Sequence, residues 1–356
     1  MSSATKLVLL SATLAVAGGL IFFLWRSPAR VPVRAPAASA TTPASATPPG
    51  TLRDPLAPER LVRIDESRAL AADWVSARPG FQASRSAAER GGVEPCATQA
   101  FDTSGFEEWQ PLSRGHFTLP RDFKLDAEGG FDLVMHFNGE SPVLRELVES
   151  GQRFVLYTFT LPPTDSYAAV FASRLLFPAL VNEIEQKVSQ RAGKPAHHRR
   201  LALSAWSAGF TGVRTLLAQP AGESADAVLL IDGLHAPRGD RQAFEAQLEP
   251  FLSYATRAAA GERLFLVSHS SIDPPDFAST TECAHYLIHR LGGEPQPVRR
   301  DDPLGLELVE YFTRAQFHVR GYSGNDKADH CAELAVLRGA FVALGKRWAE
   351  SGATAR

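Results

Sequence analysis

Two kinds of segment alternate regularly along this chain, and the alternation limits the folds that it can adopt. From Phe131 onward, apolar runs of strand length alternate with longer segments whose apolar residues recur at helical spacing. Six runs are short and rich in strand-forming residues: FDLVMHF (131–137), RFVLYTF (153–159), RLALSAW (200–206), AVLLID (227–232), RLFLVSH (263–269) and FHVRGY (317–322). Such runs are typical of a parallel sheet covered by helices on both faces. The sequence therefore predicts an α/β fold, with its strand-to-helix loops gathered at the carboxyl edge of the sheet.

The segments between these runs are expected to be the covering helices. Their sequences are PVLRELVES, YAAVFASRLLFPALVNEIEQKV, TGVRTLLAQ, RQAFEAQLEPFLSYATRAAA and, before and after the loop near residue 300, ASTTECAHYLIHRLG and LGLELVEYFTRA. Each carries apolar residues three and four positions apart, as a helix with one buried face requires.

The amino-terminal part of the chain has a different character. Leu7 to Trp25 carries no charge and is about as long as a bilayer core requires, so residues 1–26 are predicted to be an N-terminal membrane anchor, with a cleaved signal sequence as the alternative. Residues 27–55 are rich in Pro, Ala, Ser and Thr and are predicted to be a disordered linker. Residues 56–110 are expected to form a lead-in segment packed on a main domain of residues 111–356.

The orientation of this anchor is ambiguous in the sequence. Arg26, Arg30 and Arg34 outnumber Lys6, which favours a cytoplasmic domain, whereas the linker composition is typical of an exported tether. We expect the domain to lie outside the cytoplasm, or to be secreted if the anchor is cleaved.

Composition excludes several classes of function. An apolar fraction of 44% is enough for a large core, and a formal net charge of -2 gives little attraction for nucleic acid. The three cysteines, Cys96, Cys283 and Cys331, match no zinc pattern, and the sequence leaves their pairing open. His197-His198 has no acidic or cysteine companions, so no metal site and no organic cofactor are expected.

A candidate nucleophile lies in Ala205-Trp206-Ser207-Ala208-Gly209. This stretch follows a predicted strand and opens a predicted helix, and small residues two before and two after the serine suit a sharp turn. It resembles the nucleophile elbow of the α/β-hydrolase superfamily, although Ala205 replaces the usual first glycine. The resemblance implies an α/β-hydrolase fold in which Ser207 attacks an acyl carbonyl.

The same resemblance implies that an acid and then a histidine follow the serine on later strand ends. His330 comes after the last predicted strand and before the last helix, where the superfamily carries its catalytic base; His269, His235 and His318 are weaker candidates.

Two aspartates compete for the role of the acid. Asp273 follows RLFLVSH in an Asp-Pro arrangement and is favoured, whereas Asp232 ends AVLLID one strand earlier, a position that some lipase-like members use. Glu282 and Asp329 are less favoured.

The superfamily's oxyanion hole joins the N–H of the residue after the nucleophile to one from the loop after an early strand. Ala208 is expected to supply the first, and Phe137 or Asn138, in the stretch HFNG, the second.

Together these residues imply a serine hydrolase that cleaves an ester or related acyl bond through an acyl-enzyme. The expected partners are a small or lipid-like acyl substrate and, through the anchor, a membrane. Two alternatives stay open at this point: a peptidase or amidase acting on cell-envelope material, and a non-catalytic domain of the same fold that serves in binding.

Overall fold

A computed structural model describes residues 100–162, 165–301, 307–324 and 327–354. All of them belong to one unit of the chain, Arg53–Arg356. The predicted anchor, the linker and almost all of the lead-in segment lie outside the described residues and stay predictions. Within the described part of the chain, no helix combines the length and the apolar character needed to cross a bilayer.

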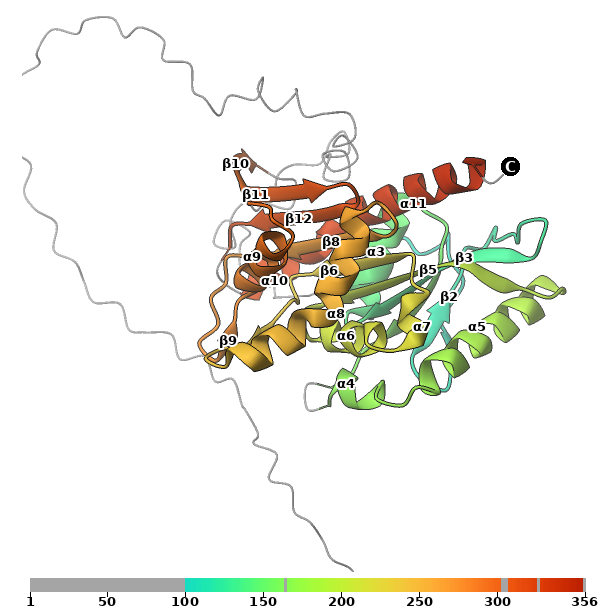
Figure 1. The fold of residues 1–356 in the computed structure, drawn as a ribbon. Helices are drawn as coiled ribbons and strands as arrows, with labels where there is room; N and C mark the ends of the chain where they lie inside the picture. Colours follow the sequence, from blue (N-terminus) through green and yellow to red (C-terminus); the bar gives the residue numbers. More distant parts are fainter. Residues whose placement is uncertain (1–99, 163–164, 302–306, 325–326, 355–356) are drawn as a thin grey trace, which may run out of the picture. The chain divides into compact units, whose positions relative to one another are not determined.

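One large sheet of ten strands organises the described residues (Figure 1). In spatial order its strands are β1 (Gln110–Pro111), β2 (His116–Thr118), β4 (Val155–Phe159), β3 (Gly130–Phe137), β5 (His197–Trp206), β6 (Ala227–Ile231), β8 (Leu264–His269), β12 (Phe317–Tyr322), β11 (Glu307–Arg314) and β10 (Gln296–Asp301). The strands from β4 to β12 in this order run parallel, and the two strands at each edge are antiparallel. A second sheet pairs β7 (Ala236–Pro237) with β9 (Phe277–Ala278).

The six predicted strand runs correspond to the six parallel strands. Each run overlaps its strand to within a few residues, and the strands are buried because helices cover both faces. The α/β fold with a mostly parallel central sheet is therefore confirmed.

Helices form a layer on each face of the sheet (Figure 1). One layer holds α3 (Glu140–Ser150) and α11 (Val336–Thr354), and the other holds α5 (Leu176–Ala192), α6 (Phe210–Leu217), α8 (Arg241–Ala259) and α9 (Thr280–Arg290). The side chains of β3 alternate accordingly: Leu133 and Met135 join the core under the second layer, and Val134 joins the core under the first. The shorter helices are α4 (Tyr167–Val170), α7 (Pro220–Glu223), α10 (Lys327–Ala332) and the 3-10 turns η2 (Ser207–Gly209) and η3 (Glu333–Ala335).

The helix predicted for LGLELVEYFTRA is wrong, because residues 307–314 of that segment form strand β11. β11 pairs antiparallel with β12 along most of its length. Its buried side chains, Leu308 and Phe312, are four residues apart, a spacing that a helix places on one face. In the strand, a register shift between Leu308 and Glu310 puts them instead in the cores on opposite faces of the sheet. Val309, Tyr311 and Thr313 favour a strand, and pairing with β12 decides the outcome.

Candidate active site

The sharp turn after β5 holds Ser207 in a backbone conformation that non-glycine residues rarely adopt. Its φ is 53°, and η2 and then α6 begin at this residue and at Phe210. A Cβ atom at Gly209 would lie 2.2 Å from the carbonyl oxygen of Phe137, so only glycine fits there. Ala205, in contrast, is fully buried within β5, where its methyl group is accommodated. The turn therefore requires glycine after the serine and tolerates alanine before it.

The loop after β6 lies directly against this turn. A Cβ atom at Gly233 would lie 2.5 Å from the carbonyl oxygen of Ser207 and 2.9 Å from its nitrogen. The preceding residue, Asp232, has a φ of 39°, which directs the chain back at the strand end. This close approach brings the carboxylate of Asp232 to the same edge as Ser207.

Asp232 is a buried carboxylate that receives four hydrogen bonds. Its Oδ1 accepts from the Ser270 N–H at 2.9 Å, the Ser270 hydroxyl at 3.0 Å and the Thr280 hydroxyl at 2.8 Å. Its Oδ2 lies 2.7 Å from Nδ1 of His330. Burial raises the pKa of Asp232, but the hydrogen bonds and charge of His330, Ser270 and Thr280 outweigh it and hold the pKa at about 2. The group is therefore ionised at neutral pH.

His330 lies on α10 and is held on two sides. Because the ionised Asp232 can only accept, Nδ1 of His330 carries the proton and Nε2 presents its lone pair. The indole ring of Trp206 stacks on the imidazole with ring centroids 4.8 Å apart, and its Nε1–H donates to the His330 carbonyl oxygen at 3.2 Å. Sequence reasoning did not identify Trp206, because the residue before an elbow serine follows no rule of type.

The favoured acid, Asp273, forms no hydrogen bond with His330 that the structure shows among the described residues, and its contact is with Arg238. Its side chain is 76% exposed and its Oδ1 accepts from Arg238 at 2.6 Å. Glu282 also binds Arg238 and accepts from the N–H of Ser279 at the start of α9. The structure thus brings the alternative acid, Asp232, to His330 and leaves Asp273 in a surface ion pair.

The other candidate histidines have different surroundings. Nδ1 of His235 lies 3.2 Å from the Ala278 carbonyl oxygen, and its ring packs against Phe277. His318 is buried, and burial together with the charges of Arg320 and Arg347 lowers its pKa to about 3. His269 is buried at the end of β8 and contacts Glu310. None of these three contacts Asp232 by a hydrogen bond that the structure shows among the described residues.

The loop after β3 differs from the expected oxyanion hole in one respect. The backbone N–H of Asn138 donates to the Phe159 carbonyl oxygen at 3.0 Å and is not free to bind substrate. Phe137 is the last residue of β3, and its carbonyl oxygen lies against Gly209. The Asn138 side chain does reach the turn, because its Nδ2 donates to the Trp206 carbonyl oxygen at 3.2 Å. Ala208, the other expected donor, is exposed at the beginning of η2, where helix N–H groups lack partners within the helix.

His136 fixes the conformation of this loop. Burial lowers its pKa to about 4, so the ring is neutral at pH 7. Its Nε2–H donates to the Asn138 carbonyl oxygen at 2.7 Å, and Nδ1 accepts from the Ser204 hydroxyl at 2.8 Å. These bonds support the left-handed backbone of Asn138, whose φ is 77°.

The cysteines do not pair as Cys283 with Cys331. Cys283 is free and buried in α9, whereas Cys331, next to His330, is disulfide-bonded.

No family model and no curated protein matches the chain. Among solved structures, the chain is similar to an uncharacterised protein from Capnocytophaga ochracea at 10% identity and a TM-score of 0.40, covering 66% of this chain and 64% of that one. It is also similar to a feruloyl esterase module from Clostridium thermocellum (8% identity, TM-score 0.42, 70% and 92% covered). A siderophore hydrolase, EstB, from Aspergillus nidulans matches at 10% identity and a TM-score of 0.41, with 68% and 96% covered. Likenesses this distant carry no argument about chemistry, which has to come from the side chains described above.

Proposed function

We propose that the chain is a serine esterase in which Ser207 is the nucleophile, His330 the general base and Asp232 the orienting acid. The observation that carries the proposal is the buried contact of Asp232 with Nδ1 of His330 at 2.7 Å, beside a serine held at a φ of 53°. Gly233 links the two features, because it follows Asp232 and packs on the backbone of Ser207.

In this proposal the reaction proceeds through an acyl-enzyme. The Ser207 oxygen attacks the carbonyl carbon of an ester while its proton moves to Nε2 of His330. Asp232 stabilises the resulting imidazolium, which then donates the proton to the leaving alcohol as the carbon–oxygen bond breaks. Water repeats the sequence: His330 accepts its proton, the hydroxide attacks the acyl carbon, and the Ser207 oxygen leaves with the proton.

Two donors are proposed to bind the oxyanion of each tetrahedral intermediate. One is the Ala208 N–H, at the start of η2. The other is the second N–H of the Asn138 side-chain amide, whose first N–H is held by the Trp206 carbonyl oxygen next to Ser207. An amide side chain can fill this role because the oxyanion requires only a positioned N–H.

Fluorophosphonate labelling of the full chain tests the proposal. We expect the wild-type protein to be labelled at Ser207 and to hydrolyse short-chain aryl esters, whereas Ser207→Ala, folded as judged by circular dichroism, is neither labelled nor active. The matched control is Ser224→Ala, because Ser224 is exposed after α7 and its hydroxyl donates only to the Ala221 carbonyl oxygen. A folded wild-type protein that does not label would favour the non-catalytic alternative, and cleavage of peptides but not esters would favour the amidase.

We further propose that the catalytic domain lies outside the cytoplasm. The disulfide at Cys331 supports this placement, because disulfides persist mainly in oxidising compartments. The predicted anchor of residues 1–26 would hold the domain at the membrane. A periplasmic alkaline phosphatase reporter fused after Gly50 should be active in cells, and an inactive fusion that is stably made would contradict the proposed orientation.

A further inference from the structure

Strands β8, β12 and β11 are neighbours in the sheet, and they bring two side chains that can bind metal, His269 and Glu310, together over a glycine. In the strand register, His269 of β8 is paired with Gly321 of β12, and Gly321 with Glu310 of β11. A Cβ atom at Gly321 would lie 2.5 Å from Cε1 of His269 and 2.6 Å from Cγ of Glu310. The glycine therefore leaves the space into which His269 and Glu310 lean from either side.

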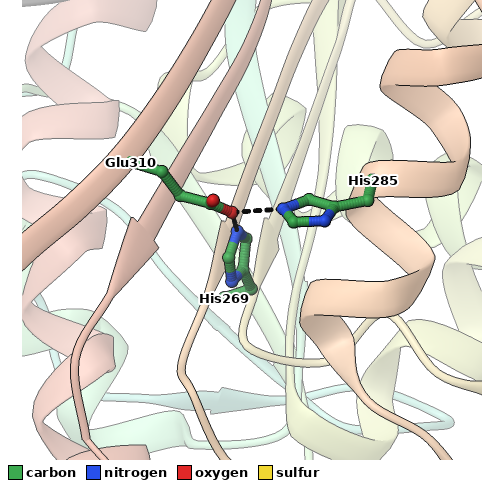
Figure 2. Close-up of side chains that lie close together, drawn as sticks. All are labelled: His269, His285 and Glu310. Carbon is green, nitrogen blue, oxygen red and sulfur yellow. Dashed lines mark hydrogen bonds and ion pairs between the residues drawn. The ribbon is translucent and has the colours of Figure 1, made fainter. Parts of the chain in front are cut away.

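His285 completes the group from helix α9. Figure 2 shows its imidazole and that of His269 both directed at the Glu310 carboxylate. Oε1 of Glu310 lies 3.0 Å from Nε2 of His269 and 2.5 Å from Nε2 of His285. One ligand atom from each of the three residues lies within 4.8 Å of the other two. We call these three residues the His–His–Glu cluster.

The protein alone leaves one nitrogen of the cluster without a proper hydrogen bond. His269 is 1% exposed, and its Nε2, although 3.0 Å from Glu310, has no partner of acceptable geometry among the described residues. Its Nδ1 lies 3.0 Å from the hydroxyl of Thr281, and that hydroxyl donates to the Ser270 carbonyl oxygen at 2.8 Å. Since a hydroxyl donates only once, Nδ1 must carry the proton and donate to Thr281.

With Nδ1 protonated, Nε2 can face the Glu310 oxygen, 3.0 Å away, in two ways: it carries a second proton and forms an ion pair, or it presents its lone pair to a cation bound between the two groups. An Nδ1–H bonded to a neighbouring oxygen and a free Nε2 lone pair are the usual arrangement of a metal-binding histidine. Two imidazole nitrogens and one carboxylate form a common ligand set for zinc.

We propose that Nε2 of His269, Nε2 of His285 and the carboxylate of Glu310 bind one divalent transition-metal ion, with zinc as the expected occupant. Zinc bonds of about 2.0–2.1 Å place tetrahedral ligand atoms about 3.3 Å apart. His285 would move away from Glu310, whose Oε1 lies 2.5 Å from its Nε2, and the ligand atoms of the set, which lie within 4.8 Å of one another, would close to that spacing. The fourth position would be filled by solvent. The sequence pattern did not predict this site, because its ligands come from three elements at irregular spacing.

The cluster shares its supporting segments with the proposed catalytic acid. Ser270 and Thr280 donate to Asp232, and the residues next to them, His269 and Thr281, belong to the cluster or contact it. A bound metal would thus fix the β8 loop and the beginning of α9 together. Its expected role is to stabilise the scaffold of Asp232, with no part in bond cleavage.

The test measures zinc binding directly, on the full chain freed of any histidine tag and stripped by dialysis against a chelator. Competition with a chromophoric zinc chelator should give one tight site per chain, and zinc should raise the midpoint of thermal unfolding. His285→Ala should lower zinc affinity by about 100-fold or more, since changes beyond the ligands alone cost 10–100-fold. Glu310→Gln, which keeps the shape of the side chain, should lower it similarly.

The matched control is His289→Ala. His289 lies one turn along α9 from His285, but its Nε2 lies 3.1 Å from Glu294 and outside the cluster. Its removal should leave zinc affinity unchanged. The proposal is overturned if wild-type protein binds no zinc tighter than about 10 µM, or if Glu310→Gln binds as tightly as the wild type while remaining folded. Fluorophosphonate labelling of the zinc-free protein keeps the two proposals apart. A protein that labels at Ser207 but binds no zinc would overturn the metal site and leave the esterase proposal standing.

Discussion

At the scale of single residues, the choice between Asp232 and Asp273 depends on the direction in which a loop carboxylate points. Both follow a strand at the carboxyl edge of the sheet, so position alone does not separate them. Asp232 adopts a left-handed backbone conformation that directs its side chain inward to Ser270, Thr280 and His330. Asp273 meets Arg238 on the surface instead. Because both candidates are aspartates, residue type does not show which one adopts this backbone angle, and the sequence favoured Asp273 although the structure brings Asp232 to His330.

Substitution of the two aspartates tests this assignment. Asp232→Asn should lower kcat/KM for an aryl ester by about 10³–10⁴-fold, because an amide no longer fixes the Nδ1–H tautomer of His330 or stabilises its charge. Asp273→Asn should change it by less than about threefold, since an exposed ion pair contributes little. Steady-state kinetics on both variants measures the ratio, and an equal or reversed ranking would move the acid away from Asp232.

At the scale of elements, the turn from β5 to α6 explains why alanine is accepted on one side of Ser207 and not on the other. Gly209 faces the Phe137 carbonyl oxygen, whereas Ala205 is packed among the sheet residues of its core. We expect Gly209→Ala to lower the free energy of unfolding by about 3 kcal/mol, because backbone atoms have to move to admit the methyl group. Ala205→Gly should cost only about 1–2 kcal/mol, from backbone entropy and the lost buried methyl group.

Urea unfolding and fluorophosphonate labelling of both variants provide the measurement. Ala205→Gly should still label at Ser207, and Gly209→Ala should label slowly even where it is folded. Equal stability losses in the two variants would show that the close approach at Gly209 is not the constraint.

Elements with both faces buried were the ones that the sequence predicted well. The six parallel strands are continuous apolar runs because helices cover both of their faces. Such a run can be recognised in the sequence without knowing which strands lie beside it. β1, β2, β10 and β11 lie at the edges, where one side of a strand is polar or unpaired and the pattern weakens. β11 was misread as a helix because its two buried residues are four apart, and the register shift that sends them to opposite faces of the sheet leaves no signal in the sequence.

At the scale of the whole molecule, the candidate site depends on contacts between loops far apart in the chain. The sequence predicted that strands and helices alternate, but not the order of the strands in the sheet. That order places the ends of β5, β6 and β12 near one another. The order of serine and histidine along the sequence was the basis for predicting Ser207 and His330, which stay candidates. The support given by Trp206, Gly233 and Thr280 required the folded chain, because each contacts a residue on another element.

Acid stability is a property of the whole molecule that two buried histidines should dominate. Burial lowers the pKa of His136 to about 4, and burial with the charges of Arg320 and Arg347 lowers that of His318 to about 3. In the unfolded chain these histidines have ordinary pKa values near 6.5. Below about pH 6.5 the unfolded chain therefore binds protons at positions that stay unprotonated in the folded chain. The free energy of unfolding should therefore fall as pH drops below about 6.5, by up to about 1.4 kcal/mol per pH unit for each histidine.

His318→Gln isolates one of these contributions. Asp232, whose pKa of about 2 lies below its usual value, loses its stabilisation only below about pH 4, so it does not act in the same window. Burial raises the pKa of Glu146, so its contribution to the free energy of unfolding grows as pH falls. This contribution is present in both the wild type and the variant and cancels in the comparison. Between pH 6 and 4.5, the variant should show a slope of unfolding free energy against pH that is smaller by about 1.4 kcal/mol per unit. Urea titrations at three pH values measure the slope, and parallel lines for the two proteins would mean that His318 is charged in the folded state.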